Sequence, residues 1–523
     1  MKYIMIFHAN LNYAYLTEDK YEFVIRESYE MTIDTMAEQF PTEKYVFEAS
    51  GYTVEQIALK TPDVLEKLKK AIERGQCEFM GSPYAHPMLP NFPEEDGVWS
   101  LRFANDIYKK YLGIQPKSFW NPECGWRDYV PKQVVAAGYK NMIGDFEAYS
   151  RSVGQDGKPL RPEIYEKEYS KEPAFYNFAF KYDLPGNEKA IHFPFNKIQG
   201  LPDDELRIFL RTDRIAQFAV RHFMGMPGYS FEKYIDLIKK YSQQQEEEEE
   251  GAVIIFADDA EYIGTNGWFK LKYQNLPDNV FEHTPDSREK LINLVEECQK
   301  LGSFTTFDNA CSSLPPLDQS ITFDNDSAWH GAKASTWAST PMARLLRPWQ
   351  DLVREKLQKL EDIDEATRKR IWYHLTNSYN SDGQWPPTLP DAPHIIHPFN
   401  YKYCFDNLLM AEQMVGGIDR GKLPVDPVKT LDEILTLQSK LILNKISKQI
   451  SALSGEEQEN YLLAKNFIKI CLDFSSVEKS GSPILYPSEY EYRANAMVEA
   501  RRLVGGVEIE KLEDGGYLQR DEE

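Results

Sequence analysis

The segment YIMIFHAN, residues 3–10, joins an unbroken apolar run to a histidine and an asparagine. Short apolar runs of this kind are typical of strands that are buried on both faces of a parallel sheet. The next segment, KYEFVIRESYEMTIDTMAEQF at 20–40, places its apolar residues at helical spacing. A strand followed by an amphipathic helix is the unit of parallel α/β folds, so the first forty residues predict one such unit.

The same alternation of strand and helix patterns continues to about residue 310. Helical patterns separate most of the apolar runs, as in DVLEKLKKAIERG at 63–75 and SREKLINLVEECQKLG at 287–302. Together with 3–10, this makes seven strand candidates and predicts an α/β fold with a parallel sheet. The six further runs are KYVFEASGY (44–52), CEFMGSPYAHP (77–87), PKSFWNPECGW (116–126), YKNMIGD (139–145), LRIFLRTDRIA (206–216) and GAVIIFADDAEYIG (251–264).

Beyond residue 310 the pattern becomes mainly helical. Five segments carry helical periodicity, and the last twenty residues are polar. We therefore predict an α/β domain at 1–310, a helical domain at 311–503 that packs on it, and a polar tail at 504–523. The helical segments are 341–360, 365–379, 401–415, 431–450 and 456–472.

Composition excludes several classes of partner. The 523 residues carry a net charge of -22, and no cluster of lysine and arginine suited to a nucleic-acid backbone stands out. Six scattered cysteines form neither a disulfide framework nor a zinc pattern, which favours a reducing compartment. The N-terminal apolar run lacks a cleavage site, and no segment approaches a membrane span. We expect a cytoplasmic protein with a neutral substrate.

Polar residues follow the apolar runs of nearly all the strand candidates. The carboxyl ends of parallel strands lie on one face of a barrel or open sheet, where such enzymes gather their chemistry. We therefore expect these side chains to converge. They are His8, Glu48, His86, Glu123, Asp145, Asp213 and Asp259.

The segment SFWNPECGW, residues 118–126, sets Glu123 among aromatic residues. Trp120 and Trp126 restrict the water and the rotamers of this carboxylate, and their faces can stack on a pyranose ring. A fixed, partly desolvated carboxylate needs little reorganisation when it attacks an anomeric carbon. The alternative is a structural salt bridge between Glu123 and Arg127.

The segment FADDAEYIG, residues 256–264, supplies a second group of acids: Asp258, Asp259 and Glu261. Adjacent side chains of a strand point to opposite faces, so only one of the two aspartates is expected to face a site. Two carboxylates from different strands can flank a glycosidic bond, about 5 to 5.5 Å apart in retaining hydrolases. A solvated acidic loop or a cation site is the alternative.

Histidines occur near two of the same strand ends. His8 and Asn10 end the first strand, and His86 lies in a proline-rich loop. A neutral imidazole can donate to a sugar hydroxyl or to a catalytic carboxylate. A structural role is the alternative for each of them.

Taken in order, FHANLN, GSPYAHPMLP, FWNPECGW and FADDAEYIG resemble the motifs of glycoside hydrolase family 57. The first motif departs from the family's His-x-His-Gln-Pro pattern. The resemblance implies that 1–310 is a catalytic domain built as an incomplete (β/α)7 barrel, with retaining chemistry on α-glucans. The helical domain at 311–503 is then expected to contribute to the substrate cleft. It also implies that Glu123 is the nucleophile and Asp259 the general acid/base, with Glu261 behind it, and it implies no cofactor.

The family's fifth motif resembles NSYNSDGQWPP at 377–387, where Asp382 and Trp385 are the matches. The segment SAWHGAKASTW at 327–337 is expected to bring Trp329 to the same opening of the substrate cleft. The implied substrate-binding residues are His8, Asn10, His86, Trp120, Glu261, Trp329, Asp382 and Trp385.

Several functions stay open at this stage. Within the family the candidates are α-amylase, 4-α-glucanotransferase, branching enzyme and α-galactosidase, and we favour an α-1,4-glucan hydrolase or glucanotransferase. A metal-dependent polysaccharide deacetylase needs an aspartate and two histidines, and the sequence has no His-x-x-x-His pair. A non-catalytic sugar-binding barrel is the third class. We predict an α-glucan as partner and neither nucleic acid nor membrane, whereas the oligomeric state is open.

Overall fold

The computed structural model describes most of the chain and divides it into two compact units. The first unit contains the described residues of 1–12, 18–266 and 281–335, and the second contains mainly those from 336 onward. The predicted boundary at residue 310 stays a prediction, and the tail at 504–523 lies outside the described residues. The described residues are 1–13, 16, 18–152, 158, 188–243, 250–266, 281–329, 332–384, 398–426, 436, 439–440, 443–444, 446–473, 496, 500 and 503.

The first unit is built on a parallel sheet in the order β6-β5-β4-β3-β2-β1-β7, with β8 paired beside β1. The seven predicted strands are confirmed. The sheet is nearly closed as a barrel, and Arg211 at the end of β6 donates from Nε to the Ala257 oxygen of β7, the strand at the other end of this order, at 3.1 Å. The strands are β1 (Lys2–Ala9), β2 (Tyr45–Ala49), β3 (Cys77–Gly81), β4 (Ser118–Phe119), β5 (Asn141–Asp145), β6 (Arg207–Arg211), β7 (Ala252–Asp259) and β8 (Ser303–Phe304).

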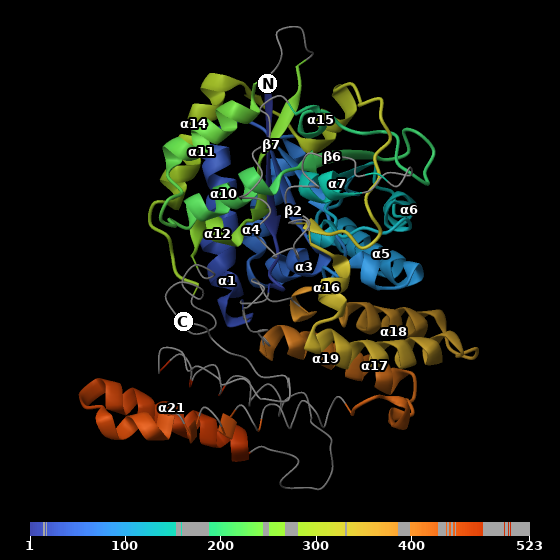
Figure 1. The fold of residues 1–523 in the computed structure, drawn as a ribbon, viewed down its shortest axis with the longest axis vertical. Helices are drawn as coiled ribbons and strands as arrows, with labels where there is room; N and C mark the ends of the chain where they lie inside the picture. Colours follow the sequence, from blue (N-terminus) through green and yellow to red (C-terminus); the bar gives the residue numbers. More distant parts are fainter. Residues whose placement is uncertain are drawn as a thin grey trace. The chain divides into compact units, whose positions relative to one another are not determined.

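Burial explains why these strands read as continuous apolar runs. All five residues of β2 and of β5 are buried, as are nearly all of β1 and β7. Helices account for this, since Figure 1 shows α10, α11, α12 and α14 on one side of the strands and α5, α6 and α7 on the other. The helices are α3 (Gly51–Lys60), α4 (Pro62–Glu73), α5 (Glu94–Tyr111), α6 (Val130–Ala136), α7 (Phe146–Arg151), α10 (Asp213–Phe223), α11 (Phe231–Tyr241), α12 (Glu261–Gly264), α14 (Ser287–Leu301) and α15 (Phe307–Ser313).

The helix predicted at 20–40 contains a π-helical stretch. It runs as α1 (Tyr21–Val24), the π-helical η2 (Ile25–Glu30) and α2 (Met31–Gln39). Helix α12 packs very closely on η2, since a Cβ on Gly264 would lie 1.9 Å from the Glu27 oxygen. Only glycine permits this approach, and π-helical stretches are frequent at functional sites.

The described part of the second unit is helical, as predicted. Its main helices are α17 (Pro341–Gln358), α18 (Glu365–Asn377), α19 (Pro398–Met414) and α21 (Gly455–Asp473). Trp349 of α17 donates from Nε1 to Glu412 of α19 at 2.6 Å, which joins two of these helices through a buried contact. In the described parts of both units, no helix combines the length and apolar character that a bilayer span requires.

Candidate active site

The turn after β4 carries Glu123 in a conformation that few non-glycine residues adopt. Glu123 has φ 54° and ψ 16°, and Cys124 next to it has φ 46°. Asn121 holds the turn by donating from Nδ2 to the Gly125 oxygen at 2.7 Å. Left-handed backbone at non-glycine residues costs about 1–3 kcal/mol each and concentrates at functional sites. The chain therefore maintains an unfavourable backbone to present this carboxylate.

Glu123 is 1% exposed, whereas Arg127 lies on the surface. The Oε1 atom of Glu123 is 3.8 Å from Nδ1 of His86. His86 also has a left-handed backbone, with φ 53°. Burial lowers the pKa of His86 well below its usual range, so the ring is neutral at ordinary pH. The buried position and the histidine neighbour both argue against a surface salt bridge to Arg127.

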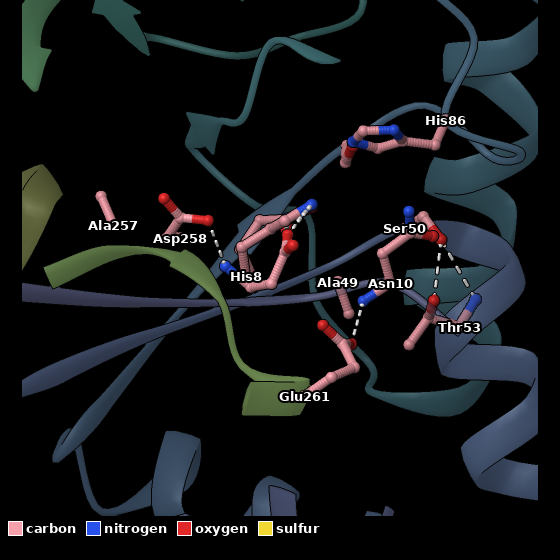
Figure 2. Close-up of polar contacts among 12 residues, drawn as sticks. His8, Asn10, Ala49, Ser50, Thr53, His86, Ala257, Asp258 and Glu261 are labelled. Atoms are coloured by element: carbon pink, nitrogen blue, oxygen red, sulfur yellow. Dashed lines mark hydrogen bonds and ion pairs between the residues drawn. The ribbon is translucent and has the colours of Figure 1, made fainter. Parts of the chain in front are cut away.

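His8 lies next to several other side chains of the site. Its ring lies flat on Trp120, with 4.5 Å between centroids and 8° between planes, and its centroid is 5.1 Å from that of His86. The Nδ1 atom contacts Glu48 Oε2, and Nε2 lies 3.9 Å from Oδ1 of Asp259. Figure 2 shows His8 with His86, Asp258 and Glu261 around it.

The charge state of the His8–Glu48 pair follows from burial. Burial lowers the pKa of His8 to about 3 and raises the pKa of Glu48 well above its usual range. Both directions favour the neutral forms, so we infer that the Glu48 carboxyl donates to Nδ1. The His8 Nε2 atom then keeps its hydrogen and presents it on the side of Asp259.

The two aspartates at the end of β7 have different surroundings, and the sequence alone did not decide which of them faces the site. Asp258 is buried and accepts from Gln217 Nε2 at 3.0 Å and from the Asp259 backbone nitrogen at 2.9 Å. The Asp259 side chain is 13% exposed and lies beside His8. Asp259 is therefore the aspartate on the side of the histidines, in agreement with the strand alternation.

Glu261 is fully buried and ties the first strand to the helices. Its Oε1 atom accepts from the Asn10 backbone nitrogen at 2.7 Å, which Figure 2 shows as a dashed line, and from the Tyr29 hydroxyl. Ser28, also in η2, donates to the Glu261 backbone oxygen at 2.8 Å. The π-helical stretch thus aims two consecutive residues at Glu261. The predicted sugar contacts of Glu261 and Asn10 stay predictions.

We expect Glu261→Gln to change how stability depends on pH. Burial raises the pKa of Glu261 from 4.5 to about 8, so the native carboxyl keeps its proton while the unfolded one releases it. Its contribution is fully present below pH 4.5 and is lost as the pH rises to about 8. The glutamine should remove this decline, by up to about 1.4 kcal/mol per pH unit.

Denaturant unfolding at pH 5 and pH 8 measures this effect. Glu66→Gln is the control, because Glu66 is an exposed carboxyl on α4. Equal declines in the wild type and in Glu261→Gln would contradict a protonated Glu261.

Arg211 is a buried residue behind the end of β7 that the sequence patterns did not single out. Its Nη1 atom lies 3.2 Å from Asp145 Oδ1 and 2.7 Å from Asp213 Oδ1, and its Nη2 atom lies 3.6 Å from Asp258 Oδ2. The ring of Trp329 lies 5.3 Å from its Cζ atom. A charged residue at the end of the apolar run RIFLR was the available signal.

Carboxylates of the same region could hold a cation. Asp145, Glu147 and Asp213 bring ligand atoms within 4.8 Å of one another. Burial raises the pKa of Glu147 to about 7, so protonation also accommodates these charges. Within the described residues, no aspartate with two histidines forms such a group. The ligand set of a deacetylase is therefore not assembled there.

Residues 2–306, more than half of the chain, match the family model described as glycosyl hydrolase family 57. The protein belongs to glycoside hydrolase family 57. The predicted family is thereby confirmed.

Two relatives of the family 57 protein are named as an α-amylase and a 4-α-glucanotransferase. A stretch of 138 residues is 33% identical to α-amylase 1 of Dictyoglomus thermophilum and covers 26% of this chain and 20% of that protein. Another, of 295 residues, is 25% identical to the 4-α-glucanotransferase of Thermococcus litoralis and covers 56% and 37%. The matched parts thus span well under half of either relative.

A solved structure extends the likeness to nearly the whole chain. The exo-type maltose-forming amylase of Pyrococcus sp. ST04 has a TM-score of 0.57 at 12% identity, covering 94% of this chain and 95% of that one. At this identity the likeness shows the fold alone, and it agrees with the expected incomplete (β/α)7 barrel with a helical C-terminal region.

Two further substrate residues of the family 57 protein were predicted from the fifth motif. Asp382 is buried in η7 (Asp382–Gln384) and belongs to the second unit. Trp385 lies outside the described residues. Their contribution to a sugar site stays a prediction, as does that of Trp329 and Trp120.

Proposed function

We propose that this protein is a retaining glycoside hydrolase or transglycosylase that acts on α-1,4-glucans. The observation that carries the proposal is the placement of Glu123 and Asp259. They come from different strand ends, and each lies within 4 Å of one of two neighbouring imidazoles. The named activities of the relatives, α-amylase and 4-α-glucanotransferase, support the substrate class.

In the first step Glu123 attacks the anomeric carbon while Asp259 protonates the leaving glycosidic oxygen. The new bond joins the carboxylate oxygen to the sugar with inverted configuration, and the departing chain takes the Asp259 proton. In the second step Asp259 removes a proton from water or a sugar hydroxyl, which displaces Glu123 and restores the α configuration. Water gives hydrolysis, and a sugar acceptor gives transfer.

The surrounding residues keep the two carboxylates in different roles. The neutral His86 near Glu123 adds no positive charge, so the carboxylate is not neutralised by a cation before attack. The Nε2 hydrogen of His8 faces Asp259 and can stabilise its ionised form after the first proton transfer. Trp120 holds the His8 ring by stacking on it, which limits the reorganisation that the reaction requires.

The product distribution tests this function. After incubation with maltoheptaose, amylose and a galactoside panel, products are analysed by mass and linkage. Shorter chains indicate hydrolysis, redistributed lengths indicate transfer, and α-1,6 links indicate branching. Binding of maltooligosaccharide without any product would favour a non-catalytic barrel and reject the proposal.

The cytoplasmic location is also a proposal. Five cysteines of the described residues are buried free thiols, which fits a reducing compartment: Cys77, Cys124, Cys298, Cys311 and Cys404.

A further inference from the structure

The end of β7 is held by two side chains that do not touch the reacting centre described above. Gln217, on the second turn of α10, donates to Asp258 Oδ2 at 3.0 Å. Arg211 lies 3.6 Å from the same oxygen and donates from Nε to the Ala257 backbone oxygen at 3.1 Å. Gln217 therefore contacts Asp258, and Arg211 contacts both Ala257 and Asp258, the two residues that directly precede Asp259.

Arg211 is itself fixed from the other side. Asp145 at the end of β5 and Asp213 at the start of α10 lie 3.2 and 2.7 Å from its Nη1 atom. All of these groups are buried, so water does not compete for the contacts. The guanidinium therefore links the ends of β5 and β6 rigidly to β7.

Asp258 connects these contacts to the next residue, Asp259. With Oδ2 occupied by Gln217 and Arg211, the other oxygen, Oδ1, is oriented to accept the Asp259 backbone N–H at 2.9 Å. This hydrogen bond sets the direction in which the Asp259 side chain leaves the strand. A general acid displaced by about 1 Å can lose about 10²-fold in rate.

We propose that Gln217 and Arg211 are positioning residues that act through Asp258 to aim Asp259 at the glycosidic oxygen. This inference rests on the proposed function, in which Asp259 is the general acid/base. It predicts that variants of these residues lose activity on substrates whose leaving group needs a proton. Activity on substrates whose leaving group needs no proton should be nearly unchanged.

Gln217→Leu is the principal variant, since it removes the donor at similar size. On maltoheptaose, kcat/KM should fall about 10- to 100-fold, while on α-maltosyl fluoride, whose fluoride leaves without strong acid assistance, it should change less than about 3-fold. Gln76→Leu is the matched control: Gln76 is also buried, but its Nε2 donates to Met36 and Phe40 oxygens before β3. It should affect both substrates equally.

Gln217→Glu supplies a second, chemically reversible variant. The introduced carboxyl can donate to Asp258 only while protonated, so the ratio of glucan to fluoride activity should recover relative to wild type as the pH falls. A merely structural role would not produce this recovery. Gln217→Glu also provides a test if the leucine variant folds poorly.

The outcomes separate the two levels of the argument. Equal losses on both substrates in Gln217→Leu, or an unchanged ratio across pH in Gln217→Glu, overturn the positioning role. If Asp259→Ala itself shows no dependence on the leaving group, the proposed function fails and this inference fails with it. If Asp259→Ala shows the dependence and both Gln217 variants lack it, only the positioning role is wrong.

Discussion

Glu123→Gln should lower kcat/KM on maltoheptaose by about 10⁴-fold or more, the order of loss that follows removal of a catalytic nucleophile. The amide has similar size, but it carries no charge to stabilise the oxocarbenium-like transition state and forms no stable glycosyl bond. Oligosaccharide binding should stay measurable by calorimetry. Retained turnover would reject Glu123 as the nucleophile.

A glycine at this position allows a stereochemical test. In Glu123→Gly, added azide can occupy the space of the lost carboxylate and attack α-maltosyl fluoride from the same face. The product should be the β-maltosyl azide, with inverted configuration, identified by NMR. Formation of the α anomer would place the nucleophile elsewhere.

The same variant should fold at least as stably as the wild type. Glycine adopts φ 54° without the steric cost that Glu123 bears, and the variant removes a buried carboxylate. Thermal unfolding measures this. A large drop in Tm would mean that the Glu123 side chain stabilises the turn, so that its left-handed backbone is not a cost imposed by function.

Asp259→Ala should lower kcat/KM on maltoheptaose by about 10²- to 10⁴-fold, the range typical of general acid–base catalysis. The loss should nearly vanish on α-maltosyl fluoride in the first step, because that leaving group does not need the Asp259 proton. The glycosyl-enzyme should then accumulate, since water loses its base, and mass spectrometry of a digest should find the sugar on the peptide containing Glu123.

Azide again provides the control for Asp259→Ala. It needs no general base, so it should release the accumulated intermediate and give the α-maltosyl azide, opposite to the Glu123→Gly product. Asp258→Ala is the informative neighbour, because the Asp258 side chain accepts a hydrogen bond from Gln217. An α azide from Asp258→Ala but not from Asp259→Ala would exchange the roles of the two aspartates.

Local sequence was sufficient to predict the strands and the residues at their ends. Strands β1 to β7 are buried on both faces, so each one appears as an apolar run that needs no knowledge of its neighbours. The polar residue that follows each run necessarily lies at the carboxyl end of the sheet. For that reason the sequence alone predicts that Glu123 and Asp259 lie at this end, with His8 and His86.

Other features depended on residues far apart in the chain. The two-residue strand β8 is too short to show a recognisable pattern of apolar residues in the sequence. It forms because Ser303 and Phe304 pair with β1. The π-helical stretch contacts Glu261 through Ser28 and Tyr29, and Glu261 lies more than two hundred residues further along the chain.

The sequence by itself determined which acids stand at strand ends, because burial and strand alternation are local properties. Only the tertiary structure decided what each acid does there. Asp258 and Asp259 are adjacent and chemically identical, and they differ because Gln217 and Arg211 bind one while His8 lies beside the other. Closure of the barrel brings these partners together from segments that lie far apart in the sequence.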